Sequence, residues 1–167
     1  MPAAEDLTLL IQAARAAGDI ALKYSGPSAQ RWDKPDGQGP VTEADLAVNA
    51  MLETMLPQAR PDYGWLSEES EDSAARLSKD RVFIIDPIDG TRSFAEGSAT
   101  WAHSLAVADR GEITAAVIYL PQRDLLYTAA KGSGAFCNGA PIRVAAPAAL
   151  STTKVLTAKP NLASQHW

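Results

Sequence analysis

The sequence predicts an α+β fold in which two N-terminal helices pack on a largely antiparallel sheet. Two observations lead to this prediction. Apolar residues recur at three- and four-residue steps over 5–24 and 43–56, which is the spacing of helices with one buried face. After residue 103 the chain shows short apolar runs separated by turn sequences, which is typical of a strand meander. Helices followed by strands in this order favour an α+β domain.

The composition is that of a globular domain and excludes several other classes. The chain has 167 residues, 46% hydrophobic and 21% charged, and its longest apolar runs are far below the roughly 18 residues of a membrane span. The net charge of −5 argues against a nucleic-acid polymer as partner. Cys137 is the single cysteine and the start of the chain lacks a signal-peptide pattern, so we expect a cytoplasmic protein.

The helices have recognisable boundaries in the sequence. The Gly- and Pro-rich segment 26–40, after the first helix, is predicted to be a mobile loop. Thr42 is expected to begin the second helix, because Thr42 and Asp45 have the spacing of a capping box. Pro57 is expected to end that helix, because proline lacks the N–H that continues the hydrogen-bond pattern.

The strands are predicted from β-branched and aromatic runs bounded by turn residues. An exposed turn or short helix is expected over 71–77, and Asn138-Gly139 is a strong hairpin-turn sequence. The strands are expected, in chain order, at 64–67, 81–85, 103–108, 113–120, 125–129, 135–137 and 141–144.

The segment Asp86-Pro87-Ile88-Asp89-Gly90-Thr91 is the strongest candidate for a functional site. A buried strand leads directly into two carboxylates, and carboxylate and carbonyl oxygens are the ligands that Mg²⁺ prefers. Gly90 would let the backbone approach an anion, which the N–H groups of Gly90 and Thr91 could bind if a helix begins there. A strand end followed by an Asp-capped turn explains the same residues without a metal.

Two further acidic segments have both a structural and a functional interpretation. Glu68 and Glu69 follow a predicted strand, where adjacent carboxylates repel unless a cation is near, although acids also suit a solvated helix start. Asp45 belongs to the capping box, and an acid in the first turn of a helix can also orient a hydroxyl or a water. The two roles of Asp45 are compatible.

Taken together, Val-Thr-x-Ala-Asp, Glu-Glu and Asp-Pro-Ile-Asp-Gly-Thr, in this order and at these separations, resemble the inositol monophosphatase family. That family includes inositol monophosphatases, bacterial 3′(2′),5′-bisphosphate nucleotidases and one type of histidinol-phosphatase. The resemblance implies a layered α/β/α fold whose second domain is mostly missing here. Residues 1–150 would form the metal- and phosphate-binding domain, and residues 151–167 would begin the second domain, with its first strand at 151–156.

The resemblance also implies a Mg²⁺-dependent phosphomonoesterase in which a metal-activated water attacks the phosphate. The implied metal ligands are Glu68, Asp86, the Ile88 carbonyl and Asp89. The implied catalytic residues are Asp45 and Thr91, which would orient the water, and Glu69, which would support the metal ligands. The implied phosphate-binding groups are Gly90 and Thr91.

The second half of the chain departs from the family. Family members carry a later Trp-Asp-x-Ala motif whose aspartate completes the second metal site, whereas no Asp or Glu follows Asp124 here. We therefore expect the chain alone to bind one Mg²⁺ weakly and to turn over slowly or not at all. A homodimer is a further expectation, because relatives are often dimeric.

Several alternatives stay open at this point. The substrate would be a 3′-phosphoadenosine 5′-phosphate-type nucleotide, inositol monophosphate or histidinol phosphate, and Arg92 after Gly-Thr favours the nucleotidase and histidinol-phosphatase branches. Arg92 would then meet a second phosphate or simply lie on the surface. A non-catalytic metal-binding or interaction module is the other class. His103 is expected to be a structural strand residue, and the three tryptophans expected to pack in the scaffold are Trp32, Trp65 and Trp101.

Overall fold

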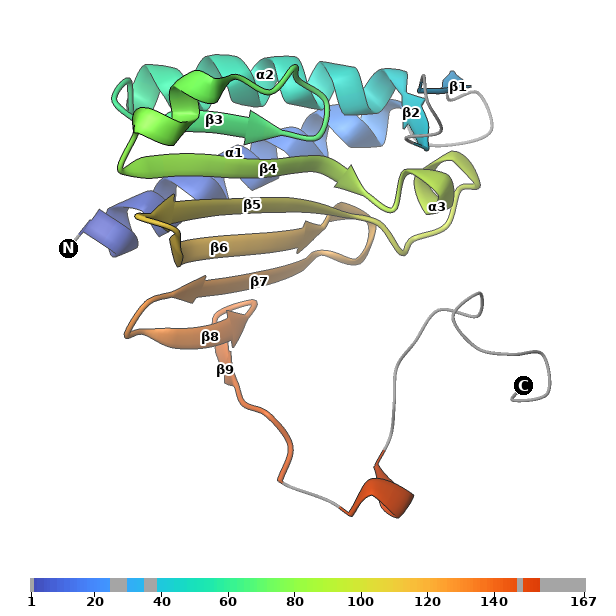
Figure 1. The fold of residues 1–167 in the computed structure, drawn as a ribbon. Coiled ribbons are helices and arrows are strands. Elements are labelled where there is room, and N and C mark those ends of the chain that lie inside the picture. Colours follow the sequence, from blue (N-terminus) through green and yellow to red (C-terminus); the bar gives the residue numbers. More distant parts are fainter. Residues whose placement is uncertain (1, 25–29, 35–38, 147–148, 154–167) are drawn as a thin grey trace.

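The computed structural model describes residues 2–24, 30–34, 39–146 and 149–153 and shows two layers, with two long helices on one face of a twisted sheet (Figure 1). The helices are α1 (Pro2–Tyr24), α2 (Glu43–Ala59) and the short α3 (Thr91–Ala95). The 3₁₀ turns within the described residues are η2 (Ala74–Ser78), η3 (Pro121–Arg123) and η4 (Leu150–Thr152). The predicted α+β class is confirmed.

Helix α1 lies against the middle of the sheet along a stripe of small residues. Ala14, Ala17 and Ala21 on this stripe are fully buried. A Cβ atom at Gly18 would come within 2.8 Å of Cε1 of Tyr119 and 3.2 Å of Cγ of Pro121. The lack of a side chain at Gly18 therefore lets the helix approach the sheet closely.

Helix α2 begins where the sequence predicts but ends later. The capping box is complete, because the Thr42 N–H donates to Asp45 Oδ2 at 2.8 Å and the Asp45 N–H donates to Thr42 Oγ1 at 3.4 Å. The prediction that Pro57 ends the helix is wrong, since α2 continues to Ala59. Proline removes one backbone donor, and the Arg60 N–H still donates to Leu56 O at 3.0 Å.

The main sheet has seven strands in chain order, β3 to β9. The first pair, β3 and β4, is parallel, and every other neighbouring pair is antiparallel. The strands are β3 (Gly64–Ser67), β4 (Arg81–Asp89), β5 (Ala102–Asp109), β6 (Glu112–Leu120), β7 (Leu125–Ala130), β8 (Gly134–Cys137) and β9 (Ala140–Ile142). The predicted meander is thus confirmed.

Two segments differ from the sequence-based expectation. Strand β4 does not end at Ile85 but continues to Asp89 through an irregularity after Asp86. Segment 26–40 is not entirely a loop, because β1 (Arg31–Asp33) and β2 (Pro40–Thr42) form a separate antiparallel ribbon. The rest of that segment falls outside the described residues, except Gln30, Lys34 and Gly39 beside the ribbon.

The two faces of the sheet have different partners. The face under α1 and α2 carries the core, in which Phe83, Leu105 and Val117 are at most 1% exposed. On the opposite face Ile84 and Ile118 are each 36% exposed. No α-helix covers this opposite face within the described residues, so the second helical layer of the predicted α/β/α arrangement is not seen there (Figure 1).

The predicted second domain lies almost entirely beyond the described residues. Residues 150–152 form a single 3₁₀ turn rather than the start of the strand expected at 151–156, and residues 154–156 are outside the described ranges. The division at residue 150 stays a prediction. Among the described residues, no helix is long and apolar enough to span a membrane.

Neighbouring positions on β4 test the assignment of the two faces. Phe83→Ala should destabilise the protein by about 3–5 kcal/mol, because it leaves a cavity under the helices. Ile84→Ala should cost less than about 1.5 kcal/mol, because its side chain already meets solvent. Urea unfolding of both variants measures the difference, and equal losses would contradict the assignment.

Candidate metal and phosphate site

The parallel pairing of β3 with β4 brings Glu68-Glu69 and the segment that begins at Asp86 to one edge of the sheet. Ser67 is opposite Ile85, so both strands reach the same edge at the same point. The Glu68 N–H donates to the carbonyl of Ile85 at 3.1 Å, which extends the pairing one residue further. Glu68 and Asp86 therefore leave neighbouring strands side by side, although 18 residues separate them in the sequence.

The end of β4 is shaped by a bulge that leaves Asp89 exposed and the Pro87 carbonyl buried. Asp86 is opposite Ser104 and Asp89 is opposite Ala102, so one extra residue is inserted on β4. His103 lies across from this bulge and its Nδ1 is 2.5 Å from the Pro87 carbonyl oxygen. The imidazole thereby holds the turn between the two aspartates from the core side.

Gly90 ends this turn and begins α3. Its φ of 92° lies in the left-handed region, and a Cβ there would meet the Thr100 carbonyl at 3.2 Å. Glycine is therefore required at this position by both conformation and space. A helix does begin at Thr91, the condition set in the sequence analysis for anion binding by these N–H groups, although it extends over five residues only.

Helix α2 supplies Asp45, which joins the capping box to the β4 turn. Asp45 is 1% exposed, and Thr91 Oγ1 lies 3.1 Å from Asp45 Oδ1 and 3.0 Å from the Ile88 carbonyl oxygen. Burial raises the pKa of Asp45, while its hydrogen bonds with Thr42 and Thr91 act in the opposite direction. The threonine hydroxyl is thus fixed between a carboxylate and a backbone carbonyl, both implied to belong to the site.

The carboxylate of Asp86 has the properties expected of a cation ligand. Burial raises its pKa to about 7, and the nearby carboxylates of Glu68, Asp89 and Asp45 contribute to the rise. Its Oδ1 atom is buried and has no hydrogen-bond partner. A buried, unpaired carboxylate oxygen among other acids is costly unless a cation is bound, and oxygen donors of this kind fit Mg²⁺. The donor set therefore fits the implied metal.

Lys34 is a functional candidate that sequence reasoning missed. Its Nζ lies 3.2 Å from Glu68 Oε1 and 2.7 Å from Glu69 Oε1, and its side chain is only 10% exposed. Burial opposes the charge of Lys34, but the two glutamates outweigh it and raise its pKa. Burial likewise raises the pKa of Glu69, which Lys34 counteracts. Lys34 directly follows the strand β1, in a segment whose Gly and Pro content indicated only a loop.

The structure thus gathers every residue of the predicted site at one edge of the sheet. Glu68 is half exposed, Glu69 is buried beside Lys34, and Asp89 and Gly90 are exposed. In the present side-chain positions, no three His, Cys, Asp or Glu side chains of the described residues form a closed set around one point. Lys34 pairs with Glu68 and Glu69 instead. The individual roles of these residues stay predictions.

The residues considered for packing have different environments. Trp101 is 2% exposed and packs edge-to-face on Phe94 with ring centroids 4.9 Å apart, as a scaffold residue would. Trp32 is 44% exposed on β1, so the expectation that it packs in the scaffold is wrong. Its strand belongs to a two-stranded ribbon that has no second face to bury it. Arg92 is exposed at the start of α3.

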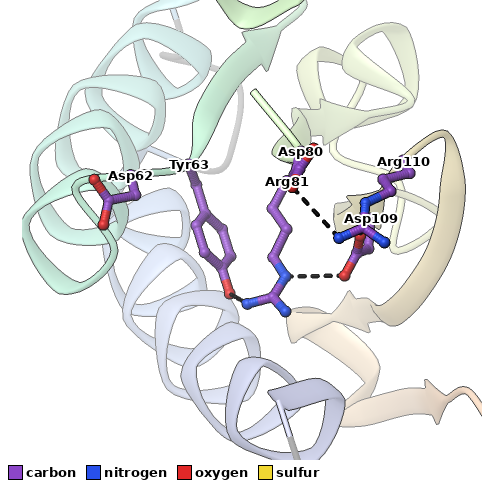
Figure 2. Close-up of a pocket in the computed structure, with 6 residues that line it drawn as sticks. All are labelled: Asp62, Tyr63, Asp80, Arg81, Asp109 and Arg110. Carbon is purple, nitrogen blue, oxygen red and sulfur yellow. Dashed lines mark hydrogen bonds and ion pairs between the residues drawn. The ribbon is translucent and has the colours of Figure 1, made fainter. Parts of the chain in front are cut away.

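A cavity at the other end of β4 has a structural explanation. It has a volume of about 290 Å³ and is lined by charged residues around Tyr63 (Figure 2). Arg81 donates to Asp109 Oδ2 at 3.0 Å and to the Tyr63 hydroxyl at 3.0 Å, and that hydroxyl lies 3.0 Å from Asp6 Oδ2. These groups satisfy one another's hydrogen bonds. The network beside the cavity therefore links α1 to the start of β4, and the cavity is not the candidate site.

The fold and the candidate site together define an α+β domain with a group of carboxylates at one edge of its sheet. The inositol monophosphatase family matches residues 3–166, and the chain belongs to that family. Inositol-1-monophosphatase of Rhizobium meliloti is 41% identical over 122 residues, which are 73% of this chain and 46% of that protein. Histidinol-phosphatase of Chlorobaculum parvum is 39% identical over 152 residues, 90% of this chain and 58% of that protein.

The likeness extends to solved structures. The extragenic suppressor protein suhB from Bartonella henselae superimposes with a TM-score of 0.78 at 37% identity, over 86% of this chain and 55% of that chain. The resemblance inferred from the motifs is thereby confirmed. The chain spans about half to three fifths of the length of these relatives.

Asp86 should make the metal-free protein less stable as the pH rises. Its pKa of about 7 in the folded state lies above its ordinary 3.8, so its contribution is full below about pH 4 and is lost as the pH passes 7. Asp86→Asn removes this loss. Urea unfolding in EDTA should show the variant gaining about 1–3 kcal/mol on wild type between pH 4 and pH 8, after allowance for solvent screening. A pH-independent difference would contradict this.

His103 should have the opposite pH dependence. Burial lowers its pKa from 6.5 to about 4, so the stability contributed by the neutral imidazole is full above pH 6.5 and is lost as the pH falls toward 4. The loss can reach about 3 kcal/mol. His103→Gln should fold less stably at pH 7 but show a shallower decline between pH 6.5 and 4. An unchanged slope in urea unfolding would count against this.

Proposed function

We propose that this chain contributes the metal- and phosphate-binding half of a Mg²⁺-dependent phosphomonoesterase. The observation that carries the proposal is the state of Asp86, whose buried Oδ1 has no hydrogen-bond partner and whose pKa is raised by burial and by the nearby carboxylates of Glu68, Asp89 and Asp45. Such an arrangement is unfavourable for the apo protein and is explained by a cation. Membership of the inositol monophosphatase family supports the same reading.

The proposed metal ligands are Glu68, Asp86, the Ile88 carbonyl and Asp89. When bound there, Mg²⁺ would supply activation of a water and neutralisation of phosphate charge. The chain's own residues complete the site. Thr91 Oγ1, held by Asp45 and the Ile88 carbonyl, can orient a water for in-line attack and pass a proton toward the Asp45 carboxylate. No histidine base is needed in this scheme.

The remaining groups would bind the phosphate and set the electrostatics of the site. The backbone of Gly90 and Thr91 is placed to approach a phosphate oxygen, because Gly90 carries no side chain at this turn. Glu69 and Lys34 form an adjacent ion pair of 2.7 Å, which opposes the rise that burial causes in the pKa of Glu69. We assign Glu69 a supporting role beside the metal ligand Glu68.

Small alcohol phosphomonoesters are the proposed substrates. Relatives named inositol-1-monophosphatase and histidinol-phosphatase support inositol monophosphate and histidinol phosphate as candidates. A 3′-phosphoadenosine 5′-phosphate-type nucleotide is a further candidate, for which exposed Arg92 after Gly90-Thr91 could contact a second phosphate. The proposed location is cytoplasmic, and homodimerisation is a further proposal.

A non-catalytic module is the second candidate function. The observation that favours it is the open sheet face, on which Ile84, Ile113 and Ile118 are 36–48% exposed. Apolar residues grouped in this way are typical of a surface that contacts another protein segment. The acids at the sheet edge would then serve binding rather than turnover.

Magnesium titration of the purified chain tests the proposal. With phosphate present, saturating MgCl2 should raise the melting temperature of wild type, because a ligand of the folded state stabilises it. Asp86→Asn should lose most of this increase. Phosphate release from inositol 1-phosphate, histidinol phosphate and 3′-phosphoadenosine 5′-phosphate should be slow, Mg²⁺-dependent and abolished by EDTA.

Thr91→Val is the matched variant for the catalytic assignment. It should leave the Mg²⁺-induced increase in melting temperature nearly intact while lowering any phosphate release by about 10²-fold or more. Absence of a Mg²⁺ effect on both wild type and Asp86→Asn would favour the non-catalytic module. Rapid turnover by the 167-residue chain would contradict the expectation that it is impaired.

A further inference from the structure

A polar network on α2 lies directly beneath the turn that carries the two glutamates. Asn49 is 6% exposed, one helical turn after Asp45 on the same helix face. Its Oδ1 accepts a hydrogen bond of 2.6 Å from Ser67 Oγ, and its Nδ2 donates to Ser70 Oγ at 2.9 Å. One side chain thus binds the first and the last residue of the segment Ser67–Ser70.

The network continues into the backbone of the turn. Ser67 Oγ accepts the N–H of Glu69 at 3.3 Å, and the Ser70 N–H donates to the Ser67 carbonyl at 3.4 Å. Trp65 Nε1 donates to Ser70 Oγ at 3.2 Å from the preceding strand. Between these fixed points lie Glu68 and Glu69, whose side chains reach away from the network toward Lys34.

We propose that Asn49 is a positioning residue that holds the Ser67–Ser70 turn and thereby sets the directions of the Glu68 and Glu69 carboxylates for cation binding. This inference rests on the proposed function, because it assigns Asn49 to the same metal site. Asn49 contacts neither the carboxylates nor the substrate. It acts through the two serines.

The chemistry of the amide explains why asparagine suits this position. The site needs one acceptor for Ser67 and one donor for Ser70, and a carboxamide supplies both without charge. A carboxylate would lose the donor and add a sixth acid beside Asp45, Glu68, Glu69, Asp86 and Asp89. An apolar residue of the same size would remove the acceptor of the Ser67 hydroxyl and the amide donor to Ser70, whose hydroxyl would keep only the longer contact of 3.4 Å with Glu53 on α2.

Asn49 also couples the turn to the rest of the site. Asp45, four residues earlier, binds the Thr91 hydroxyl at 3.1 Å, so one helix face supports both the β3 turn and the β4 turn. The spacing between Glu68 and Asp86 is therefore set from two directions, by strand pairing in the sheet and by α2 beneath it. Loss of Asn49 removes only the second of these.

The test is a MgCl2 titration followed by amide and indole NMR shifts, in which the Trp65 indole reports on Ser70. Asn49→Leu should weaken Mg²⁺ affinity by about 10- to 100-fold, as expected when a contact that orients metal ligands from outside the metal's own ligand set is removed. Leu56→Ala, a fully buried change on the same helix, should lower the melting temperature but leave the affinity within about twofold. That control separates positioning from general destabilisation.

A second variant covers the case in which Asn49→Leu does not fold. Ser70→Ala leaves α2 unchanged and removes the Nδ2 partner of Asn49, and it should weaken Mg²⁺ affinity by about 3- to 10-fold. In the double variant Asn49→Ala/Ser70→Ala, the loss of Mg²⁺ affinity should be smaller than the sum of the losses in the two single variants. Both substitutions remove the same hydrogen bond between Asn49 and Ser70.

The outcomes distinguish the inference from the proposed function. No saturable Mg²⁺ shift in wild type would overturn both. Saturable binding by wild type with equal affinity in Asn49→Leu or in Ser70→Ala would overturn the positioning role alone. The same weakening in Leu56→Ala as in Asn49→Leu would also overturn it, because the effect would then be one of stability.

Discussion

The parallel alignment of β3 with β4 is the constraint on which the rest of the site depends. Strands that run in the same direction end at the same edge, so Glu68 and Asp86 lie beside each other whatever their mutual repulsion. Every other neighbouring pair in the main sheet is antiparallel. The surrounding features act on this one edge. The bulge in β4 lies between Asp86 and Asp89, Gly90 leaves room for the Thr100 carbonyl, and α2 supports the turns after β3 and β4.

The alignment brings negative charges together, and the two strand ends differ in whether a positive charge compensates them. Lys34 lies between Glu68 and Glu69 and supplies one buried positive charge. Asp86 has no comparable partner, and its pKa is accordingly raised by burial first and by neighbouring acids second. The fold tolerates the unpaired carboxylate because the apolar core lies on the other face of β4, where Phe83 and Ile85 are buried.

The features that could be predicted from sequence are those determined by nearby residues. The capping box at Thr42 and Asp45 and the hairpin at Asn138-Gly139 each depend on a few adjacent side chains. The candidate site residues were predicted from three short motifs and their order along the chain, and the structure brings these motifs to one edge of the sheet. The contacts of Lys34 and Asn49 could not be found in this way, because each joins segments 18 to 35 residues apart and has no motif of its own. The extension of β4 to Asp89 was missed because pairing with β5 outweighs the local effect of Pro87.

Because Asp45 and Asn49 lie on one face of α2, the geometry of the site depends on the rotation of that helix about its own axis. Successive residues differ by about 100° around a helix axis, so a small rotation of α2 would shift both side chains together and in the same sense. The axis is held by the packing of α2 against α1 in the apolar core. Residues that pack α2 against α1 therefore influence the alignment of the turns after β3 and β4, although they lie outside both turns.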